Sequence, residues 1–333
     1  MKLEQMPRYP LLCGFTPLQR MENLEQALGC GPLYIKRDDL TPLGLGGNKT
    51  RKLEFLLGDA LAGGADTLVT VGGVQTNHGR LTAAAAAKAG LACTLVLDGA
   101  RPEELSGNLL LDCLLGASLV YTDGRSAPAV IEETLAALQA AGRAPYFIPE
   151  GGSNAVGSAG YLAMVPELLA QADSLPVPPA RLVCTMGSLG TFAGLWLGAR
   201  AFGAPFSVTG VAVNPTTGYT REKAAALVNE MSAAYGLDIA AAPEDMDIIY
   251  ADAAHDYAGP GYNVPDAKTR GAVELLARTE GIFLDPCYTA KSFRGFCDIA
   301  RELDGGAIFV HTGGTPALWT QEHLDAFAAD YWN

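Results

Sequence analysis

Two lysines follow a run of glycines near the N-terminus. The segment Leu43–Lys52 reads LGLGGNKTRK, which places Lys49 and Lys52 just after three glycines. Glycines let the backbone approach a ligand closely, and the amides of a helix N-terminus bind anions. The two lysines are three residues apart and would share one helical face. The pattern favours an anion site, although a solvated basic helix start would look the same. It is not a P-loop, because Asn48 separates Gly47 from the first lysine.

A second polar loop lies at 71–80, with the sequence VGGVQTNHGR between an expected strand and an expected helix. Gln75, Thr76 and Asn77 offer neutral donors and acceptors at the helix N-terminus, which suits a carboxylate. The plainer interpretation is that Thr76 or Asn77 only caps the helix. The sequence leaves both interpretations open.

A third loop, TMGSLGT at 185–191, again joins a strand to a helix. Its backbone amides, together with the hydroxyls of Ser188 and Thr191, would form a nest for a phosphate. The spacing is not GxGxxG, so the loop does not indicate a dinucleotide site. Many turns in α/β proteins look similar, and this loop is weak evidence by itself.

Three short groups near the C-terminal end complete the set of polar loops: PGY at 260–262, DPCYT at 285–289 and HTGGT at 311–315. Isolated tyrosines such as Tyr262 and Tyr288 are more often core or interface residues than acids. His311 follows an apolar strand and is more often structural. Cys287 could be a nucleophile, but no motif pairs it with a base.

Composition limits the classes of partner. The 333 residues are 49% hydrophobic and 18% charged, which predicts a folded chain of about two domains. The net charge of -13 would repel a nucleic-acid backbone or an anionic membrane surface. There is no apolar run long enough for a membrane span, and the start MKLEQMPRYPLL shows no secretory signal. We therefore expect a small-molecule ligand, no nucleic acid and no membrane.

The seven cysteines are scattered, odd in number and without a CxxC motif. That usage argues against a disulfide scaffold and against a structural zinc site. The four histidines form no HExxH and no ligand pair at helical spacing, so no metal site is predicted. The expectation is a reduced, cytoplasmic protein.

Short apolar runs alternate with longer Ala/Leu-rich runs along the whole chain, and their lengths separate strands from helices. The predicted strands are 33–36, 67–71, 93–97, 118–121, 181–185, 207–213 and 307–311. The predicted helices include 48–62, 79–89, 127–141, 158–171, 191–201, 220–234, 267–279 and 290–303. This alternation predicts parallel sheets covered by helices. A Gly/Ser-rich stretch at 149–160 and a Pro-rich one at 174–180 could bracket a crossover between two α/β lobes, near which ligands bind.

Taken together, the four loop regions resemble fold-type II pyridoxal-phosphate enzymes of the D-cysteine desulfhydrase and 1-aminocyclopropane-1-carboxylate deaminase group. The most specific strings are GGNKTRKLEFL at 46–56 and GGSNAVG at 151–157, and the resemblance runs from Thr16 to Leu318. It implies an α/β fold like that of the tryptophan synthase β chain, with two open, mostly parallel twisted sheets and helices on both faces. It also implies a larger cofactor-binding domain (1–49 and 161–333), a smaller α/β domain (50–160) and a homodimer.

The resemblance assigns roles by motif, with pyridoxal 5'-phosphate as the cofactor. Lys49 would form the Schiff base, and the phosphate would be held by Lys52 and by Gly187, Ser188, Leu189, Gly190 and Thr191. Asn77 would bond the phenolate oxygen, and Thr312 would face the pyridine nitrogen. The substrate carboxylate would lie on Gln75, Thr76 and Asn77. Tyr262 and Tyr288 would lie beside the substrate and act with Lys49 in catalysis.

The residue types suit this chemistry. Lysine is the side chain that supplies an amine for the cofactor aldehyde, and burial near another cation would lower its pKa enough for base work. A neutral hydroxyl at the ring nitrogen, as with Thr312, favours rapid loss of a β-leaving group over a long-lived carbanion.

One position separates the subfamilies, because the deaminases have Glu after the second tyrosine and this chain has Thr289. The leading hypothesis is therefore α,β-elimination of D-cysteine, or of a close β-substituted amino acid, to pyruvate, hydrogen sulfide and ammonia. The alternatives are an L-cysteate sulfo-lyase, then the deaminase, and, from a different class, a non-catalytic amino-acid-binding module, which would not need Lys49. Departures from the desulfhydrase pattern are Leu189 for Gly, Thr76 for Ser, and Cys287 for an aliphatic residue.

Overall fold

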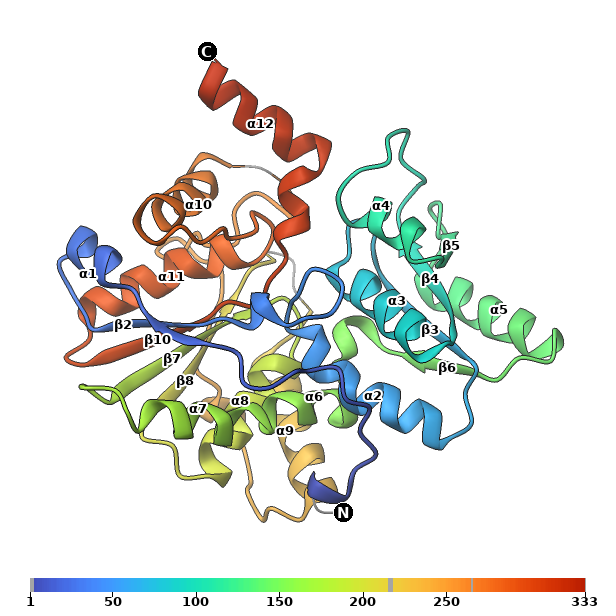
Figure 1. Cartoon of the computed structure of the whole chain (residues 1–333), viewed down its shortest axis with the longest axis horizontal. Helices are drawn as coiled ribbons and strands as arrows, with labels where there is room; N and C mark the ends of the chain where they lie inside the picture. The colour runs from blue at the N-terminus through green and yellow to red at the C-terminus, as the bar shows by residue number, and fades with distance from the viewer. Residues whose placement is uncertain (1–2, 215–217, 265, 333) are drawn as a thin grey trace.

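The structure, a computed structural model, describes residues 3–214, 218–264 and 266–332, and contains two open sheets (Figure 1). The six-stranded sheet has the order β1-β2-β10-β7-β8-β9 and the four-stranded sheet the order β5-β4-β3-β6. Only β1 runs antiparallel to its neighbour among the described pairs. The strands of the larger sheet are β1 (Leu18–Arg20), β2 (Leu33–Lys36), β7 (Pro179–Met186), β8 (Ser207–Ala212), β9 (Ile248–Ile249) and β10 (Gly306–Val310). Those of the smaller sheet are β3 (Thr67–Gly73), β4 (Ala92–Asp98), β5 (Ser118–Tyr121) and β6 (Pro145–Ile148).

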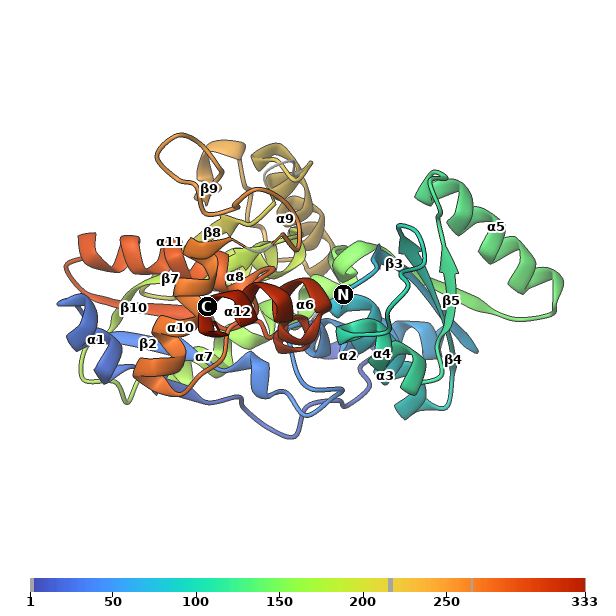
Figure 2. The ribbon, with the colours of Figure 1, turned by 90° about the horizontal axis from the view of Figure 1, so that it is seen from above.

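Helices cover both faces of each sheet, as Figure 2 shows from a second direction. Around the larger sheet they are α1 (Glu22–Leu28), α6 (Ala155–Leu162), α7 (Met164–Ala172), α8 (Gly190–Ala201), α9 (Arg221–Tyr235), α10 (Ala267–Glu280) and α11 (Thr289–Glu302). Around the smaller sheet they are α2 (Lys49–Ala62), α3 (Asn77–Ala89), α4 (Gly107–Leu114) and α5 (Ala127–Ala140), and α12 (Gln321–Trp332) ends the described chain. The helices α6 to α9 share one core with the larger sheet, and α1, α10 and α11 share another on its opposite face. The predicted fold class, two mostly parallel sheets with helices on both faces, is confirmed.

The seven predicted strands and eight predicted helical regions are all present, with small shifts at their ends. Predicted helix 158–171 is the exception, because it belongs to two helices, α6 and α7, which meet at Ala163. Pro166 has no amide proton to donate to the carbonyl of Leu162, so the hydrogen-bond ladder of α6 cannot continue through it. The elements that were not predicted are short or weakly patterned: β1, β6, β9, α1, α4 and α12.

The four strands of the smaller sheet all fall between residues 67 and 148. The domain boundaries given above remain a prediction. Close helix packing joins the two sheets: α6 packs on both α2 and α8. A Cβ at Gly160 would lie 2.3 Å from the carbonyl oxygen of Arg51, so only glycine permits this approach of α6 to α2.

Loops after the strands carry the polar motifs. The carboxyl end of β3 leads into Gln75–Asn77, that of β7 into Gly187–Leu189, and that of β10 into His311–Gly314. In open α/β sheets, ligands bind beyond the carboxyl ends of parallel strands. Among the described residues, no helix is long and apolar enough to cross a membrane.

Candidate active site

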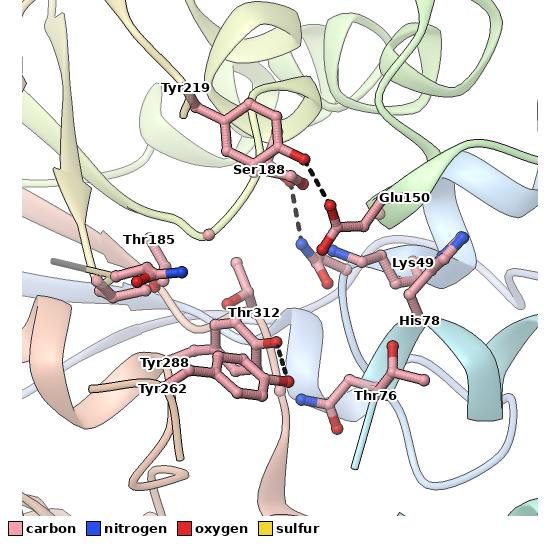
Figure 3. Close-up of a pocket in the computed structure, with 18 of the residues that line it drawn as sticks. Lys49, Thr76, His78, Glu150, Thr185, Ser188, Tyr219, Tyr262, Tyr288 and Thr312 are labelled. Carbon is pink, nitrogen blue, oxygen red and sulfur yellow. Dashed lines mark hydrogen bonds between the residues drawn. The ribbon is translucent and has the colours of Figure 1, made fainter. Parts of the chain in front are cut away.

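A cavity of about 420 Å³ lies between the loops of the two sheets (Figure 3). Nine of the predicted site residues line it, and they come from segments far apart in the chain. These nine are Lys49, Thr76, Asn77, Gly187, Ser188, Thr191, Tyr262, Tyr288 and Thr312. Four others, Lys52, Gln75, Leu189 and Gly190, do not line the cavity.

Lys49 is the first residue of α2 and points its amine into the cavity (Figure 3). Within the described part of the chain, Nζ makes no hydrogen bond and no ion pair. Burial lowers the pKa of this amine to about 8, and the nearby carboxylate of Glu150 only partly opposes that shift. About a tenth of the amine is therefore neutral at pH 7, far more than for an ordinary lysine, and the neutral form is the one that a nucleophile or a base requires.

Lys52 lies one turn further along α2 and is fully buried. Its Nζ donates to the carbonyl oxygen of Gly151 at 2.9 Å. Burial, together with the neighbouring Lys49, holds its pKa well below the usual range. A Cβ at Gly190 would lie 2.7 Å from this Nζ, so the amine lies directly behind the start of α8.

The loop before α8 presents donors to the cavity. Gly187, Ser188 and Thr191 line the cavity, whereas the side chain of Leu189 packs into the core beside α8. The Leu189 side chain therefore does not occupy the nest that a phosphate would need. The loop is held from outside by Ser153, whose Oγ donates to Ser188 Oγ at 2.9 Å and accepts from the Gly190 amide at 3.1 Å.

Thr76 and Asn77 line the cavity at the start of α3. The hydroxyl of Thr76 also accepts from the Gly79 amide at 3.2 Å, so the predicted capping role is present as well. Gln75 is directed elsewhere: its Nε2 donates to the Ser106 carbonyl at 3.1 Å and its Oε1 accepts from the Asn108 amide at 2.8 Å. The structure thus does not bring Gln75 to the predicted carboxylate site.

Tyr262 and Tyr288 meet at one wall of the cavity (Figure 3). The hydroxyl of Tyr288 donates to that of Tyr262 at 2.7 Å, and the rings pack edge to face with centroids 5.6 Å apart. Burial raises the pKa of both phenols well above the usual range. Both hydroxyls therefore keep their protons at neutral pH and can donate them.

Two residues beside Tyr288 face away from the cavity. Thr289 Oγ1 donates to Asp285 Oδ1 at 2.6 Å and accepts from the Asp285 amide at 2.8 Å, at the start of α11. Cys287 is buried, and burial raises the pKa of its thiol to about 12. A neutral thiol outside the cavity is not a nucleophile for a ligand within it, so the interpretation of Cys287 as a nucleophile gains no support.

Thr312 lines the cavity after β10, and its carbonyl accepts from the Asn48 amide at 3.0 Å. The preceding His311 is fully buried, and both of its ring nitrogens are bonded to backbone groups. Its Nε2 lies 3.0 Å from the Phe283 carbonyl, and its Nδ1 accepts from the Gly313 amide at 3.2 Å. This imidazole holds the turn that carries Thr312.

The cavity also contains residues that the motifs did not single out. The polar ones among them are Asn48, His78, Glu150, Thr185, Asn214, Tyr219 and Lys223. Tyr219 donates to Glu150 Oε2 at 2.8 Å. Burial and the two lysines hold the pKa of His78 well below its usual range, so its ring is neutral. Asn48 and His78 are next to predicted site residues in the sequence, and Glu150 directly precedes the GGSN string, so their positions in the chain could have indicated them. Tyr219 is next to no such motif.

This donor set fits pyridoxal phosphate. A buried amine without a partner suits the aldehyde, and amides with hydroxyls at a helix N-terminus suit the phosphate. A neutral hydroxyl at Thr312 and an amide at Asn77 are available for polar atoms of the ring. The fold and the cavity together define the class of enzyme that uses a phosphate-bearing aldehyde cofactor between two α/β sheets.

Comparison with known proteins agrees. Residues 10–313 match the family described as "Pyridoxal-phosphate dependent enzyme", and the chain belongs to this family. It is 41% identical to a D-cysteine desulfhydrase of Yersinia enterocolitica, over 96% of this chain and 97% of that one. It is 39% identical to a putative 1-aminocyclopropane-1-carboxylate deaminase of Pyrococcus abyssi, over 95% and 94% of the two chains.

Solved structures show the same relationship. The crystal structure of an ACC deaminase homologue superposes with a TM-score of 0.88 at 36% identity, covering 98% of this chain and 97% of that one. A fungal L-serine ammonia-lyase from Rhizomucor miehei superposes with a TM-score of 0.66 at 19% identity, which shows a shared fold alone.

Proposed function

We propose that this protein is a pyridoxal-phosphate dependent lyase that converts D-cysteine and water to pyruvate, hydrogen sulfide and ammonia. The main observation is that the unpartnered amine of Lys49 lines the same cavity as the protonated pair Tyr262 and Tyr288. One group can accept a proton and the other can donate one, which is what elimination of a thiol needs. The 41% identity to D-cysteine desulfhydrases supports the same substrate.

When bound, the cofactor supplies an aldehyde for the covalent link to Lys49 and a ring that withdraws electrons from the substrate α-carbon. Once released from that link, the Lys49 amine takes the proton from the α-carbon. Its pKa of about 8 keeps it neutral often enough for this role, because burial disfavours the ammonium form. Lys52, behind the start of α8, would bond to the phosphate, and in the absence of that anion burial and the neighbouring Lys49 disfavour its ammonium form.

Other side chains orient the reactants. Thr76 and Asn77 would hold the substrate carboxylate at the N-terminus of α3, where the helix amides also favour an anion, and the Asn77 side chain would also bond the phenolate oxygen of the cofactor. Ser188, Thr191 and the loop amides hold the phosphate. Thr312 would face the ring nitrogen with a neutral hydroxyl. Gln75 is left out of this set, because its amide is bonded within the neighbouring loop.

The tyrosine pair protonates the leaving sulfur. Tyr288 donates to Tyr262, and the Tyr262 hydroxyl, which also lies against the Cys287 thiol, would turn its proton to the substrate. Delivery of that proton to the departing hydrosulfide, with the Tyr288 proton moving to Tyr262 behind it, would release hydrogen sulfide, and a proton from solvent would then restore Tyr288. Tyr288→Phe should therefore slow turnover much more than it weakens cofactor binding.

Deamination of 1-aminocyclopropane-1-carboxylate is the second candidate, favoured by the ACC deaminase homologue with the same fold at 36% identity. Opening a cyclopropane breaks a carbon–carbon bond without a good leaving group and needs a stronger electron sink. The residue after Tyr288 is Thr289, which is neutral and bonded to Asp285 away from the cavity. This site therefore favours loss of a thiol.

A substrate panel tests the proposal: D-cysteine, L-cysteine, L-cysteate, β-chloro-D-alanine and 1-aminocyclopropane-1-carboxylate at equal enzyme and saturating concentration. Ketoacid, sulfide and sulfite are measured over time. We expect D-cysteine to release sulfide and pyruvate well above any ketobutyrate from the cyclopropane substrate. Faster turnover of the cyclopropane would replace the proposed activity with deamination, and release of sulfite from L-cysteate would replace it with a sulfo-lyase.

We also propose a cytoplasmic homodimer. All seven cysteines are unpaired, which suits a reducing compartment. The dimer follows from the family resemblance alone. Sedimentation at micromolar concentration tests it, and a monomer would overturn it.

A further inference from the structure

Next to Asn77, and not lining the cavity, lies a fully buried asparagine that the motifs did not single out. Asn108 is the second residue of α4 and has no exposed surface. Its Nδ2 donates to the carbonyl of Gln75 at 2.9 Å and to Oδ1 of Asn77 at 3.1 Å. Its backbone amide donates to Oε1 of Gln75 at 2.8 Å. Gln75 and Asn77 of the polar loop 71–80 are therefore both bonded to the side chain of Asn108.

Backbone groups determine the direction of every hydrogen bond in this network. The Gln75 carbonyl can only accept, so the Asn108 atom facing it must be the NH2 group. The same NH2 group reaches the Asn77 side chain, so the Asn77 atom facing it must be the oxygen. At the other end, the Asn108 amide can only donate and the Ser106 carbonyl can only accept, which orients the Gln75 amide as well. No member of the network can turn over without placing two donors or two acceptors in contact.

This network determines which group of the Asn77 side chain remains available to a ligand in the cavity. With Oδ1 occupied, Asn77 has its NH2 group left over, and within the described residues that group has no hydrogen-bond partner. A Cβ added at Gly314 would lie 3.0 Å from this nitrogen, which places Nδ2 against the turn that follows Thr312. An NH2 group stabilises an anionic oxygen, whereas the amide oxygen would repel it. The orientation of Asn77 therefore decides whether its contact with the cofactor is attractive.

We propose that Asn108 is a positioning residue that locks Asn77 with its NH2 group toward the phenolate oxygen of the cofactor ring. The proposal rests on the proposed function, since it takes the assignment of Asn77 from there. Asn108 does not touch the cavity and reaches the cofactor only through Asn77. Oδ1 of Asn108 is buried and has no hydrogen-bond partner among the described residues, which costs free energy. An apolar side chain would avoid that cost but could not donate to Asn77.

The test is the substitution Asn108→Asp, which keeps the shape and replaces the donor by a carboxylate oxygen. Asn77 must then turn its NH2 group toward α4 and its oxygen toward the cavity. We expect the apparent pKa of the bound cofactor, read from its visible absorbance against pH, to rise. Cofactor affinity of the apoenzyme should fall about tenfold or more, because a hydrogen bond to a charged group is lost. Asn108→Ala, which also removes the donor, should shift both readouts in the same direction.

Gln75→Met is the matched control. It removes both hydrogen bonds of the Gln75 amide and loosens the same loop, but it leaves the bond between Asn108 and Asn77 intact. A structural role for this loop would move the absorbance in the control as well, and that result would overturn the proposal. We expect the control to lower thermal stability without moving the absorbance titration.

Asn77→Ala separates failure of this inference from failure of the proposed function. If Asn77→Ala shifts the absorbance and neither Asn108 variant does, Asn108 is not a positioning residue and the proposed function stands. If none of them shifts it, the assignment of Asn77 is wrong and the inference fails with it. If both single changes shift it, the double variant Asn77→Ala/Asn108→Ala should shift no further than Asn77→Ala alone, because both act through one contact. Additive shifts would overturn the proposal.

Discussion

Helix α2 carries three basic side chains within its first four residues, and they lie in two different environments. On one side, the Arg51 guanidinium is fully bonded: Nε donates to Asp38 Oδ2 at 2.8 Å and Nη1 to Glu167 Oε2 at 2.9 Å. On the other side, Lys49 has no partner within the described residues, and Lys52 has one backbone carbonyl. Arg51 and Lys52 are both buried, so the number and charge of their partners distinguish the two sides.

The pKa values follow the partners. Burial alone would lower the pKa of Arg51, but the carboxylates of Asp38 and Glu167 outweigh it and raise that pKa. Burial alone would raise the pKa of Asp38, but Arg51 outweighs it and lowers that pKa. No carboxylate bonds to Lys49 or Lys52, so burial dominates and both pKa values fall.

The difference explains how one helix can serve stability and chemistry together. The Arg51 side ties α2 to η2 (Asp38–Leu40) and to α7, and Tyr161 of α6 adds a hydrogen bond to Asp38 at 2.6 Å. Charges in such a network stay ionised and the elements stay in place. The Lys49 side gains no such bonds and keeps an amine whose charge can change. The ion-paired side of α2 thus holds the helix in place, and the other side presents an amine that can gain or lose a proton.

The largest effect is expected from Lys49→Ala. Turnover should fall by several orders of magnitude, because both the covalent link and the base are lost. The visible absorbance of the linked cofactor should disappear, although cofactor can still dock through its phosphate. The folded state should lose little stability, since no bond to Lys49 is broken. Borohydride reduction followed by mass spectrometry is the check; cofactor still attached to the variant would move the assignment to Lys52.

Removing the Arg51 ion pairs, on the opposite side of α2, should lower the free energy of unfolding and have little direct effect on the chemistry at Lys49. Arg51→Met leaves the carboxylates of Asp38 and Glu167 buried without their cation, which should cost about 3–5 kcal/mol of unfolding free energy. Urea unfolding measures the loss. Arg301→Met is the control, because its ion pair with Asp298 is half exposed and should contribute little. Equal losses in the two variants would show that burial of the Arg51 network is not what stabilises it.

Asp112 of α4 gives a second buried charge with few partners, and its two oxygens have no hydrogen bond within the described residues. Burial raises its pKa to about 7, with Arg80 opposing the shift. Between about pH 4 and pH 7 the native state therefore binds more protons than the unfolded state, so stability falls as pH rises through that window. Removing the group with Asp112→Asn should flatten this part of the profile, a change of about 1–3 kcal/mol between pH 5 and pH 8. Urea unfolding at both pH values checks it, and parallel profiles for the two proteins would count against the shift.

The smallest effect is expected at the carboxylate contact. Thr76→Ala removes a hydroxyl that lines the cavity, and apparent substrate binding should weaken about tenfold. The same hydroxyl caps α3, so a loss of about 1 kcal/mol of stability should accompany it. Thr76→Ser keeps the hydroxyl and serves as the control for both measurements. Michaelis constants for D-cysteine that agree between Thr76→Ala and the parent enzyme would remove Thr76 from the substrate site.

Local sequence was sufficient for the main elements and for the lysine. Strand and helix lengths follow from runs of similar residues, and the string GGNK places a lysine at a helix start wherever the rest of the chain lies. The same holds for the loop 187–191 before α8. The short elements β1 and β9 could not be predicted, because two or three residues contain too little pattern and depend on a neighbouring strand.

Partners distant in the chain were decided by tertiary structure alone. Lys49 and Arg51 are two residues apart and equally basic in the sequence, yet one meets carboxylates from residues 38 and 167 and the other meets none. Likewise, Gln75 and Asn77 are alike as amides, but Asn108 draws the first away from the cavity and orients the second toward it. Sequence determines which chemical groups are available. Their charge state and direction depend on desolvation and on hydrogen-bond partners, and both exist only once the chain has folded.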